Sequence, residues 1–206
     1  SKPKILFVEG GSQYDIYAMR SAGIDPATGK EIFIKKNGEY TFNYDEKERV
    51  AVGNTNPILQ GSLMNTLRYK GFSISVATSY TFGSDYFNST LKNKVENIDL
   101  NYNVDRRVFT DRWKEPGDHT RFLGIGTSSS SSQYSERFVE KRNELYISSI
   151  QVMYDFAPKA ITRLGLRKLA IGFGLSDIAH ISTVKFERGT DYPYCRGINL
   201  IFRPTF

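Results

Sequence analysis

Strict alternation of apolar and small polar residues is the feature that most constrains this chain, and it is clearest at residues 72–82. In a β-strand, successive side chains point to opposite faces, so this pattern predicts a strand with one apolar face. The apolar positions of this segment are Phe72, Ile74, Val76, Tyr80 and Phe82. The pattern recurs at residues 59–69, 150–156, 169–175 and 192–206. Two weaker candidates near residues 5–9 and 14–22 bring the expected number of strands to seven.

The connections between these strands fall into two classes that alternate along the chain. Residues 10–13, 70–71 and 157–165 are short links, whereas residues 23–57, 83–137 and 176–191 are long. In an antiparallel meander, successive connections lie at opposite ends of the sheet, so all tight turns gather at one end. Outer-membrane barrels have this asymmetry, with short periplasmic turns and long extracellular loops. Alternation alone fits a soluble sheet with one buried face equally well, so the loop asymmetry carries the prediction of an antiparallel transmembrane β-barrel.

Strand length and the placement of aromatic residues agree with a membrane barrel. The segments at 59–69, 72–82 and 196–206 have the roughly 10 residues that a tilted strand needs to cross the apolar band. Aromatic residues fall near strand ends, as interfacial girdles require; examples are Tyr69, Phe72, Tyr154, Phe156 and Phe206. Seven strands do not close a bacterial barrel, which has an even number starting at eight. We therefore expect the chain to be part of a larger barrel.

Composition excludes several other classes of protein. No run approaches the roughly 20 apolar residues of a membrane helix, and the basic residues behind the net charge of +6 form no stripe that favours nucleic acid. Cys195 is the single cysteine and allows no internal disulfide. His119 and His180 are too far apart in sequence, with too few accompanying ligands, to predict zinc. We expect no catalytic residues, no metal and no cofactor, because no nucleophile–base arrangement stands out.

An ordered series of motifs extends over nearly the whole chain. It comprises residues 22–31 (AGIDPATGKE), 52–57 (VGNTNP), 69–72 (YKGF), 103–107 (NVDRR), 112–118 (RWKEPGD), 135–140 (SERFVE), 154–156 (YDF), 187–193 (ERGTDYP) and the terminal Phe206. In these motifs the chain resembles the C-terminal portion of SusC-like (SusC/RagA) TonB-dependent outer-membrane transporters of Bacteroidetes. Residues 143–147 (NELYI) and the serine run at 128–132 depart from the family pattern.

The resemblance implies a 22-stranded barrel, of which residues 1–206 form the C-terminal part. It also implies a plug domain and an N-terminus that contacts TonB, neither of which occurs in these residues. The implied partners are a SusD-like surface lipoprotein that closes the barrel, the TonB complex, the remainder of the barrel and outer-membrane lipid. The implied cargo is an oligosaccharide or oligopeptide that is imported actively. Nucleic acid is not an expected partner. Polar residues are expected to line the lumen, among them Ser73, Ser75, Gln151, Asn199 and Arg203.

Two groups of residues are candidate functional sites. A terminal aromatic on an alternating strand is similar to the signal for the barrel-assembly machinery, so Phe206, with Phe202, is the first candidate. Loop residues that combine aromatic and charged side chains are candidate contacts for ligand or partner. These are Asp85, Tyr86, Asn88, Arg106, Arg107, Arg112, Trp113 and Asp118. The alternative is a loop that folds on itself, with a turn at 116–118 and with Arg107 or Arg112 paired to Asp105 or Asp118.

Two other classes of protein remain open at this point. One is a passive porin or small autonomous barrel, which needs no plug. The other is a soluble β-sandwich that binds carbohydrate, in which the apolar face of each strand packs against a second sheet.

Overall fold

The computed structural model describes residues 8–99, 101, 103–127, 133–162, 165–185 and 196–206. The chain divides into two compact units. The sheet unit comprises residues 58–83, 143–183 and 190–206, and the loop unit comprises residues 1–57, 84–142 and 184–189. Among the described residues, no helix is long and apolar enough to cross a membrane.

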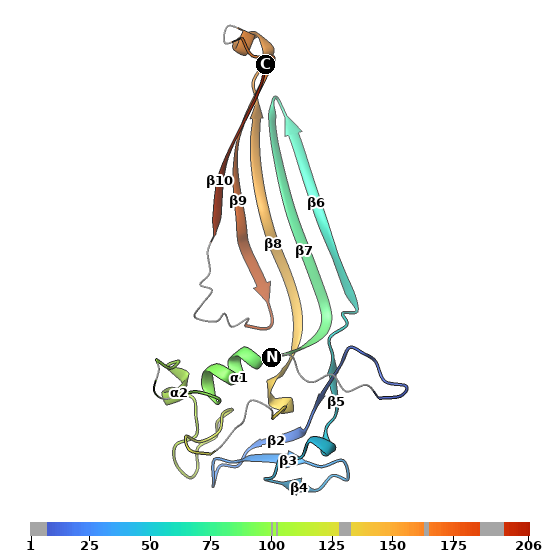
Figure 1. The fold of residues 1–206 in the computed structure, drawn as a ribbon, viewed down its shortest axis with the longest axis vertical. Helices are drawn as coiled ribbons and strands as arrows, with labels where there is room; N and C mark the ends of the chain where they lie inside the picture. Colours follow the sequence, from blue (N-terminus) through green and yellow to red (C-terminus); the bar gives the residue numbers. More distant parts are fainter. Residues whose placement is uncertain (1–7, 100, 102, 128–132, 163–164, 186–195) are drawn as a thin grey trace. The chain divides into compact units, whose positions relative to one another are not determined.

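The sheet unit contains five long strands, drawn as the long arrows in Figure 1. They are β6 (Leu59–Tyr69), β7 (Phe72–Phe87), β8 (Val139–Asp155), β9 (Lys168–Ser182) and β10 (Gly197–Thr205), and β7 and β8 extend into the loop unit. Their order in the sheet, β10-β9-β8-β7-β6, is their order along the chain, and neighbours whose register is resolved are antiparallel. This meander confirms the predicted antiparallel architecture.

One face of the sheet is apolar and exposed. The register places Leu200 opposite Phe173 and Phe202 opposite Ile171, so the apolar side chains of neighbouring strands lie in rows. Leu67 is 74% exposed and Leu200 is 83% exposed, which shows that no second sheet of the described chain covers this face. Burying an apolar face is the main driving force for folding in water. An apolar face that stays uncovered fits contact with lipid. It contradicts the soluble β-sandwich, in which a second sheet would cover this face.

The opposite face is built from small and polar residues, as predicted for a lumen. Ser75 of β7, Gln151 of β8 and Asn199 of β10 line a hollow of about 260 Å³ on this face. Gly172 and Gly174 of β9 lie where a Cβ would collide with Met153 and Asn199 respectively. Glycine therefore lets larger neighbouring side chains lie across the strand.

The two connections at one end of the sheet unit differ in length. Lys70 and Gly71 connect β6 to β7 with φ angles of 44° and 84°, the positive pair that a two-residue hairpin turn requires. Residues 156–167 connect β8 to β9 and include the short helix α3 (Pro158–Ile161). The long connections at residues 88–138 and 183–196 join strands at the other end, as the sequence predicts.

The loop unit contains short elements only. Strand β1 (Asp15–Ala18) pairs with β5 (Val50–Asn54), and β2 (Arg20–Ile24), β3 (Glu31–Ile34) and β4 (Tyr40–Thr41) form a second small sheet. The helical elements are α1 (Ser89–Val95), α2 (Arg107–Thr110) and the 3₁₀ turns η1 (Glu46–Glu48) and η2 (Glu136–Phe138). Aromatic and aliphatic side chains form the core of this unit, including Ile16, Phe87, Leu91, Phe122 and Phe138.

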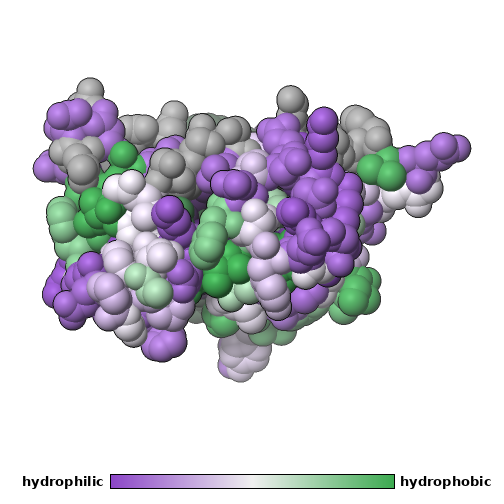
Figure 2. Space-filling model, turned by 90° about the horizontal axis from the view of Figure 1, so that it is seen from below, coloured by the Kyte–Doolittle hydropathy of each residue, from purple (hydrophilic) through white to green (hydrophobic). Residues whose placement is uncertain are grey.

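The surface seen in Figure 2 is largely hydrophilic, with smaller hydrophobic patches.

Within the described residues, five of the seven predicted wall strands form the long sheet. Residues 14–22 do form strands, but β1 and β2 belong to the small sheets of the loop unit. Ile16, Ala18 and Met19 are all buried there, and the consecutive burial of Ala18 and Met19 breaks the period of two that a wall strand needs. Of the candidate at residues 5–9, positions 5–7 lie outside the described residues and Val8 and Glu9 are not in a strand. Cys195, the residues 192–194 and the motif at 187–193 also lie outside the described residues.

Candidate functional site

A buried ion-pair cluster holds the segments of the loop unit together. The Arg137 guanidinium donates to Glu31 at 2.7 Å and to Glu96 at 2.9 Å, and all three side chains are at most 7% exposed. Burial alone would lower the pKa of Arg137, but the hydrogen bonds and charges of Glu31 and Glu96 outweigh it and raise the pKa. Because Glu31 belongs to β3, Glu96 caps α1 and Arg137 belongs to η2, one cation joins three distant segments.

Arg112 is a second buried cation, and it binds backbone carbonyls. Its guanidinium donates to the carbonyl oxygens of Leu123 and Gly124, both at 2.7 Å, and of Val95 at 3.2 Å. Burial lowers its pKa, with the charge of Glu96 opposing that effect. Arg112 therefore closes the loop that ends at residue 124. Of the pairings considered from the sequence, the one between Arg107 and Asp105 forms among the described residues.

Trp113 packs on the segment that carries the GIDPATG motif. Its indole nitrogen donates to the Pro26 carbonyl at 2.9 Å, and its ring covers Gly29, where any Cβ would collide with it. Asp118 accepts from the backbone N–H groups of Lys114 and Glu115 at 3.0 and 3.2 Å. These contacts show the loop folding on itself, as the alternative interpretation of the sequence predicts.

The remaining predicted residues lie at the junctions of loop-unit elements. Asp85 accepts from the Asn54 backbone at 2.9 Å and forms an ion pair with Lys141 at 2.8 Å. Tyr86 is half-buried and Arg106 is exposed at the start of α2. Asp105 binds Arg107 through a 2.6 Å ion pair, and the hydrogen bond from Arg107 lowers the pKa of this carboxyl group against a smaller opposing effect of burial.

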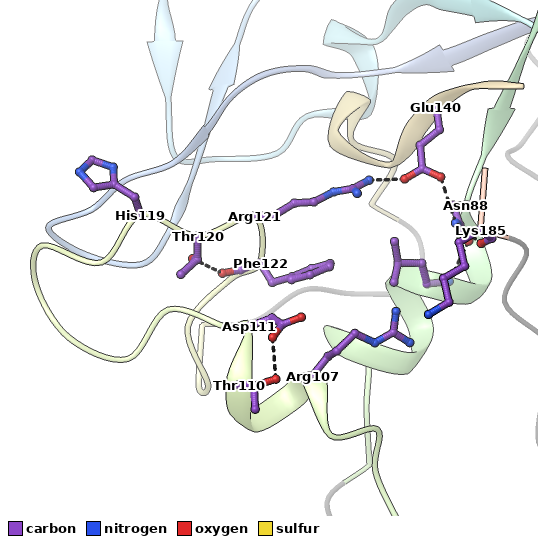
Figure 3. A pocket seen from close by; sticks show the side chains of 11 residues that line it. Asn88, Arg107, Thr110, Asp111, His119, Thr120, Arg121, Phe122, Glu140 and Lys185 are labelled. Carbon is purple, nitrogen blue, oxygen red and sulfur yellow. Dashed lines mark hydrogen bonds and ion pairs between the residues drawn. The ribbon is translucent and has the colours of Figure 1, made fainter. Parts of the chain in front are cut away.

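A pocket of about 560 Å³ lies in the loop unit and contains two predicted residues, Asn88 and Arg107 (Figure 3). Asn88 is buried, caps α1 by accepting from the Leu91 backbone at 3.0 Å, and donates to Glu140 at 3.2 Å. Arg107 extends from α2 into the pocket. Asp85, Tyr86, Arg106, Arg112, Trp113 and Asp118 do not line it.

Most of the pocket's other lining residues were not predicted from the sequence. Thr110, Asp111, Arg121, Phe122, Glu140 and Lys185 are among them. Arg121 donates to Glu140 at 2.6 Å, although these residues are 19 positions apart. His119 also lines the pocket, whereas His180 lies in the sheet unit, 3.3 Å from Glu144. Of the lining residues that were not predicted, only Glu140 falls within a motif named from the sequence. The local sequence pattern therefore does not distinguish the others from polar residues elsewhere in the loops.

The two assembly-signal candidates lie within and directly after β10, the last strand of the sheet unit. Phe202 is on the apolar face opposite Ile171, and Phe206 directly follows β10. Their side chains are 65% and 80% exposed. Both side chains can therefore be contacted by another molecule or by parts of the protein beyond the described residues.

Comparison with known proteins agrees with this fold. No family model matches the chain. It is 26% identical over 170 residues to TonB-dependent receptor P39 of Formosa agariphila, a match that covers 80% of this chain and 16% of the receptor. The chain is also similar to solved structures of the RagAB peptide transporter (16% identity, TM-score 0.66) and of the RagAB peptide importer in its open-open state (17% identity, TM-score 0.67). Each covers 82% of this chain and 19% of the solved chain.

The chain therefore shares the fold of the corresponding part of these solved structures. These matches confirm the predicted resemblance to the SusC-like (SusC/RagA) TonB-dependent transporters. The chain spans less than a quarter of the length of these relatives, at 16% and 19%.

Proposed function

We propose that this chain is the C-terminal part of the barrel wall of an outer-membrane, TonB-dependent active importer. The observation that carries the proposal is the five-stranded sheet, whose exposed apolar face is backed by a small, polar one. Alternating lipid-facing and lumen-facing residues are the requirement for a barrel strand in a membrane. The likeness to a TonB-dependent receptor supports the energised class of transporter over the passive porin.

The cargo in this proposal is an oligopeptide or oligosaccharide, and the partners are a SusD-like lipoprotein and the TonB complex. The name of the solved relatives, a peptide importer with open-open and closed-closed states, supports the peptide class and a moving lid. TonB contact and the plug are assigned to parts of the transporter outside these 206 residues. Ligand or lid contact is assigned to the loop unit, and Asn88 and Arg107 are its two predicted residues inside the pocket.

Phe206 and Phe202 are proposed to direct assembly into the outer membrane. The exposure of both rings supports recognition by an assembly partner. An exposed aromatic side chain supplies a large contact area at an interface.

Energised uptake tests the importer proposal. The full-length transporter would be expressed in cells with and without TonB, and uptake of labelled oligopeptide and oligosaccharide mixtures would be measured. Accumulation that disappears without TonB, or after a protonophore collapses the proton gradient, is the expected result. Uptake that equilibrates across the membrane and ignores both treatments would establish the passive porin instead.

A further inference from the structure

The pocket in the loop unit carries three Arg and Lys side chains and two carboxylates on its wall. Both carboxylates already have partners from the wall itself. Glu140 binds Arg121 at 2.6 Å and Asn88 at 3.2 Å, and Asp111 accepts from the Thr110 hydroxyl at 2.5 Å. The acidic side chains of the pocket are thus engaged locally.

The charged ends of Arg107 and Lys185 point toward the middle of the pocket in Figure 3. Asp105 fixes the orientation of Arg107 by accepting from Nε at 2.9 Å and from Nη2 at 2.6 Å. The backbone carbonyl of Lys185 accepts from Asn88 at 3.4 Å, which ties this residue to the cap of α1. Within the part of the chain that the structure describes, no ion pair of the Lys185 ammonium group is found.

Leu91 and Phe122 form an apolar part of the same wall. Both belong to the loop-unit core and each is 6% exposed, so their positions are fixed by packing. A volume of about 560 Å³ falls within the range of roughly 300–1,000 Å³ that is typical of small-ligand sites. The pocket therefore combines a rigid apolar surface with converging cations.

We propose that this pocket binds a carboxylate group of the cargo, with Lys185 and Arg107 as its cationic contacts and an apolar neighbouring group against Phe122. The proposal rests on the proposed import function and narrows its substrate class. A carboxylate between two cations accepts charge-assisted hydrogen bonds from both, which are about twice as strong as neutral ones. A neutral sugar offers the Lys185 ammonium group no compensating charge.

Two cargoes carry a carboxylate of this kind: a peptide with a free carboxyl terminus and an oligosaccharide with a uronate residue. Binding to the purified full-length transporter in detergent would distinguish them. The first pair of probes is the N-acetylated peptide Gly-Ala-Leu-Ala-Phe and its carboxyl-terminal amide. The second pair is digalacturonate and neutral digalactose, and both pairs are measured by calorimetry.

The decisive variant is Lys185→Gln, with Lys185→Arg to restore the charge and Lys114→Gln as a matched control. Lys114 is an exposed lysine of the loop unit that does not line the pocket. In the wild type, the acid of one pair is expected to bind about tenfold tighter than its neutral counterpart. This difference in affinity is what one hydrogen bond to a charged group contributes. That ratio falls toward one in Lys185→Gln and is kept in Lys185→Arg and Lys114→Gln.

The pair that shows the ratio identifies the source of the carboxylate. Equal affinities within both pairs, or an acid preference that survives in Lys185→Gln, would overturn the proposal. Binding needs neither TonB nor a proton gradient, so a transporter that keeps acid selectivity but fails energised uptake contradicts only the importer proposal.

Discussion

The ring of Tyr80 in β7 lies over Gly61 of β6, and a Cβ at Gly61 would be 2.5 Å from the Tyr80 hydroxyl oxygen. The two residues are direct partners in the ladder. An aromatic ring that covers a glycine on the neighbouring strand fills the space of the missing side chain and pins the register.

Replacing Gly61 with valine is therefore expected to weaken the β6–β7 pair. The new side chain would occupy the position of the Tyr80 ring and force it away from the sheet. We expect a lower folded fraction of the full-length barrel, measured by the heat-dependent shift of the band in electrophoresis. Tyr80→Ala combined with Gly61→Val removes the collision and is expected to recover folding. Equal folded fractions for Gly61→Val and the wild type would show that the ring does not constrain this pair.

Removing the charge of Arg137 is expected to open the loop unit. Arg137→Met leaves the buried carboxylates of Glu31 and Glu96 without their shared cation. Breaking a buried pair by removing one partner costs about 3–5 kcal/mol. The measurement is the rate of loop cleavage by an external protease on the assembled transporter, with Arg106→Met at an exposed position as the control. Similar cleavage rates for the two variants would show that the ion-pair cluster of Arg137 does not hold the loops together.

The Asp105–Arg107 ion pair gives the segment around α2 a dependence on pH. The pKa of Asp105 is lowered below its ordinary value of 3.8, first by the hydrogen bond from Arg107. A carboxyl group with a depressed pKa in the folded state stabilises that state fully above its ordinary pKa, and the contribution disappears as pH falls through the folded value. We expect amides 107–111 to stay protected at neutral pH and to lose protection only below pH 3.8, as measured by hydrogen exchange corrected for intrinsic rates.

Asp105→Asn provides the comparison for this pH dependence. It is expected to reduce protection of the same amides at neutral pH, whereas Asp111→Asn, at an exposed position, is expected to leave them protected. Wild-type protection at neutral pH that is no greater than that of Asp105→Asn would contradict a stabilising role of the pair.

Deleting Phe206 from the full transporter is expected to lower its abundance in outer-membrane fractions. The physical reason is the loss of an exposed aromatic contact for the assembly machinery. Quantitative immunoblotting of the outer membrane measures the effect, and Phe206→Tyr is the control that keeps the ring. Unchanged levels after deletion would remove the assembly-signal proposal and leave the barrel fold intact.

The sequence by itself located the five strands of the long sheet and their two faces, although it also predicted two strands that do not belong to this sheet. Alternation is a local property, because a period of two sends Phe72 and Ile74 to the same side wherever the strand lies. It also determined the alternation of tight turns and long loops, which the positive φ angles of Lys70 and Gly71 bear out at one turn.

Only the tertiary structure decided how the loops fold and which residues form the pocket. Residues 14–22 resembled a wall strand in their local pattern, yet pairing with β5 and β3 placed them in the loop unit. Arg137 meets Glu31 across 106 positions, and Asn88 meets the carbonyl of Lys185 across 97. Contacts at such separations depend on where the whole chain places each segment, and no local periodicity records them.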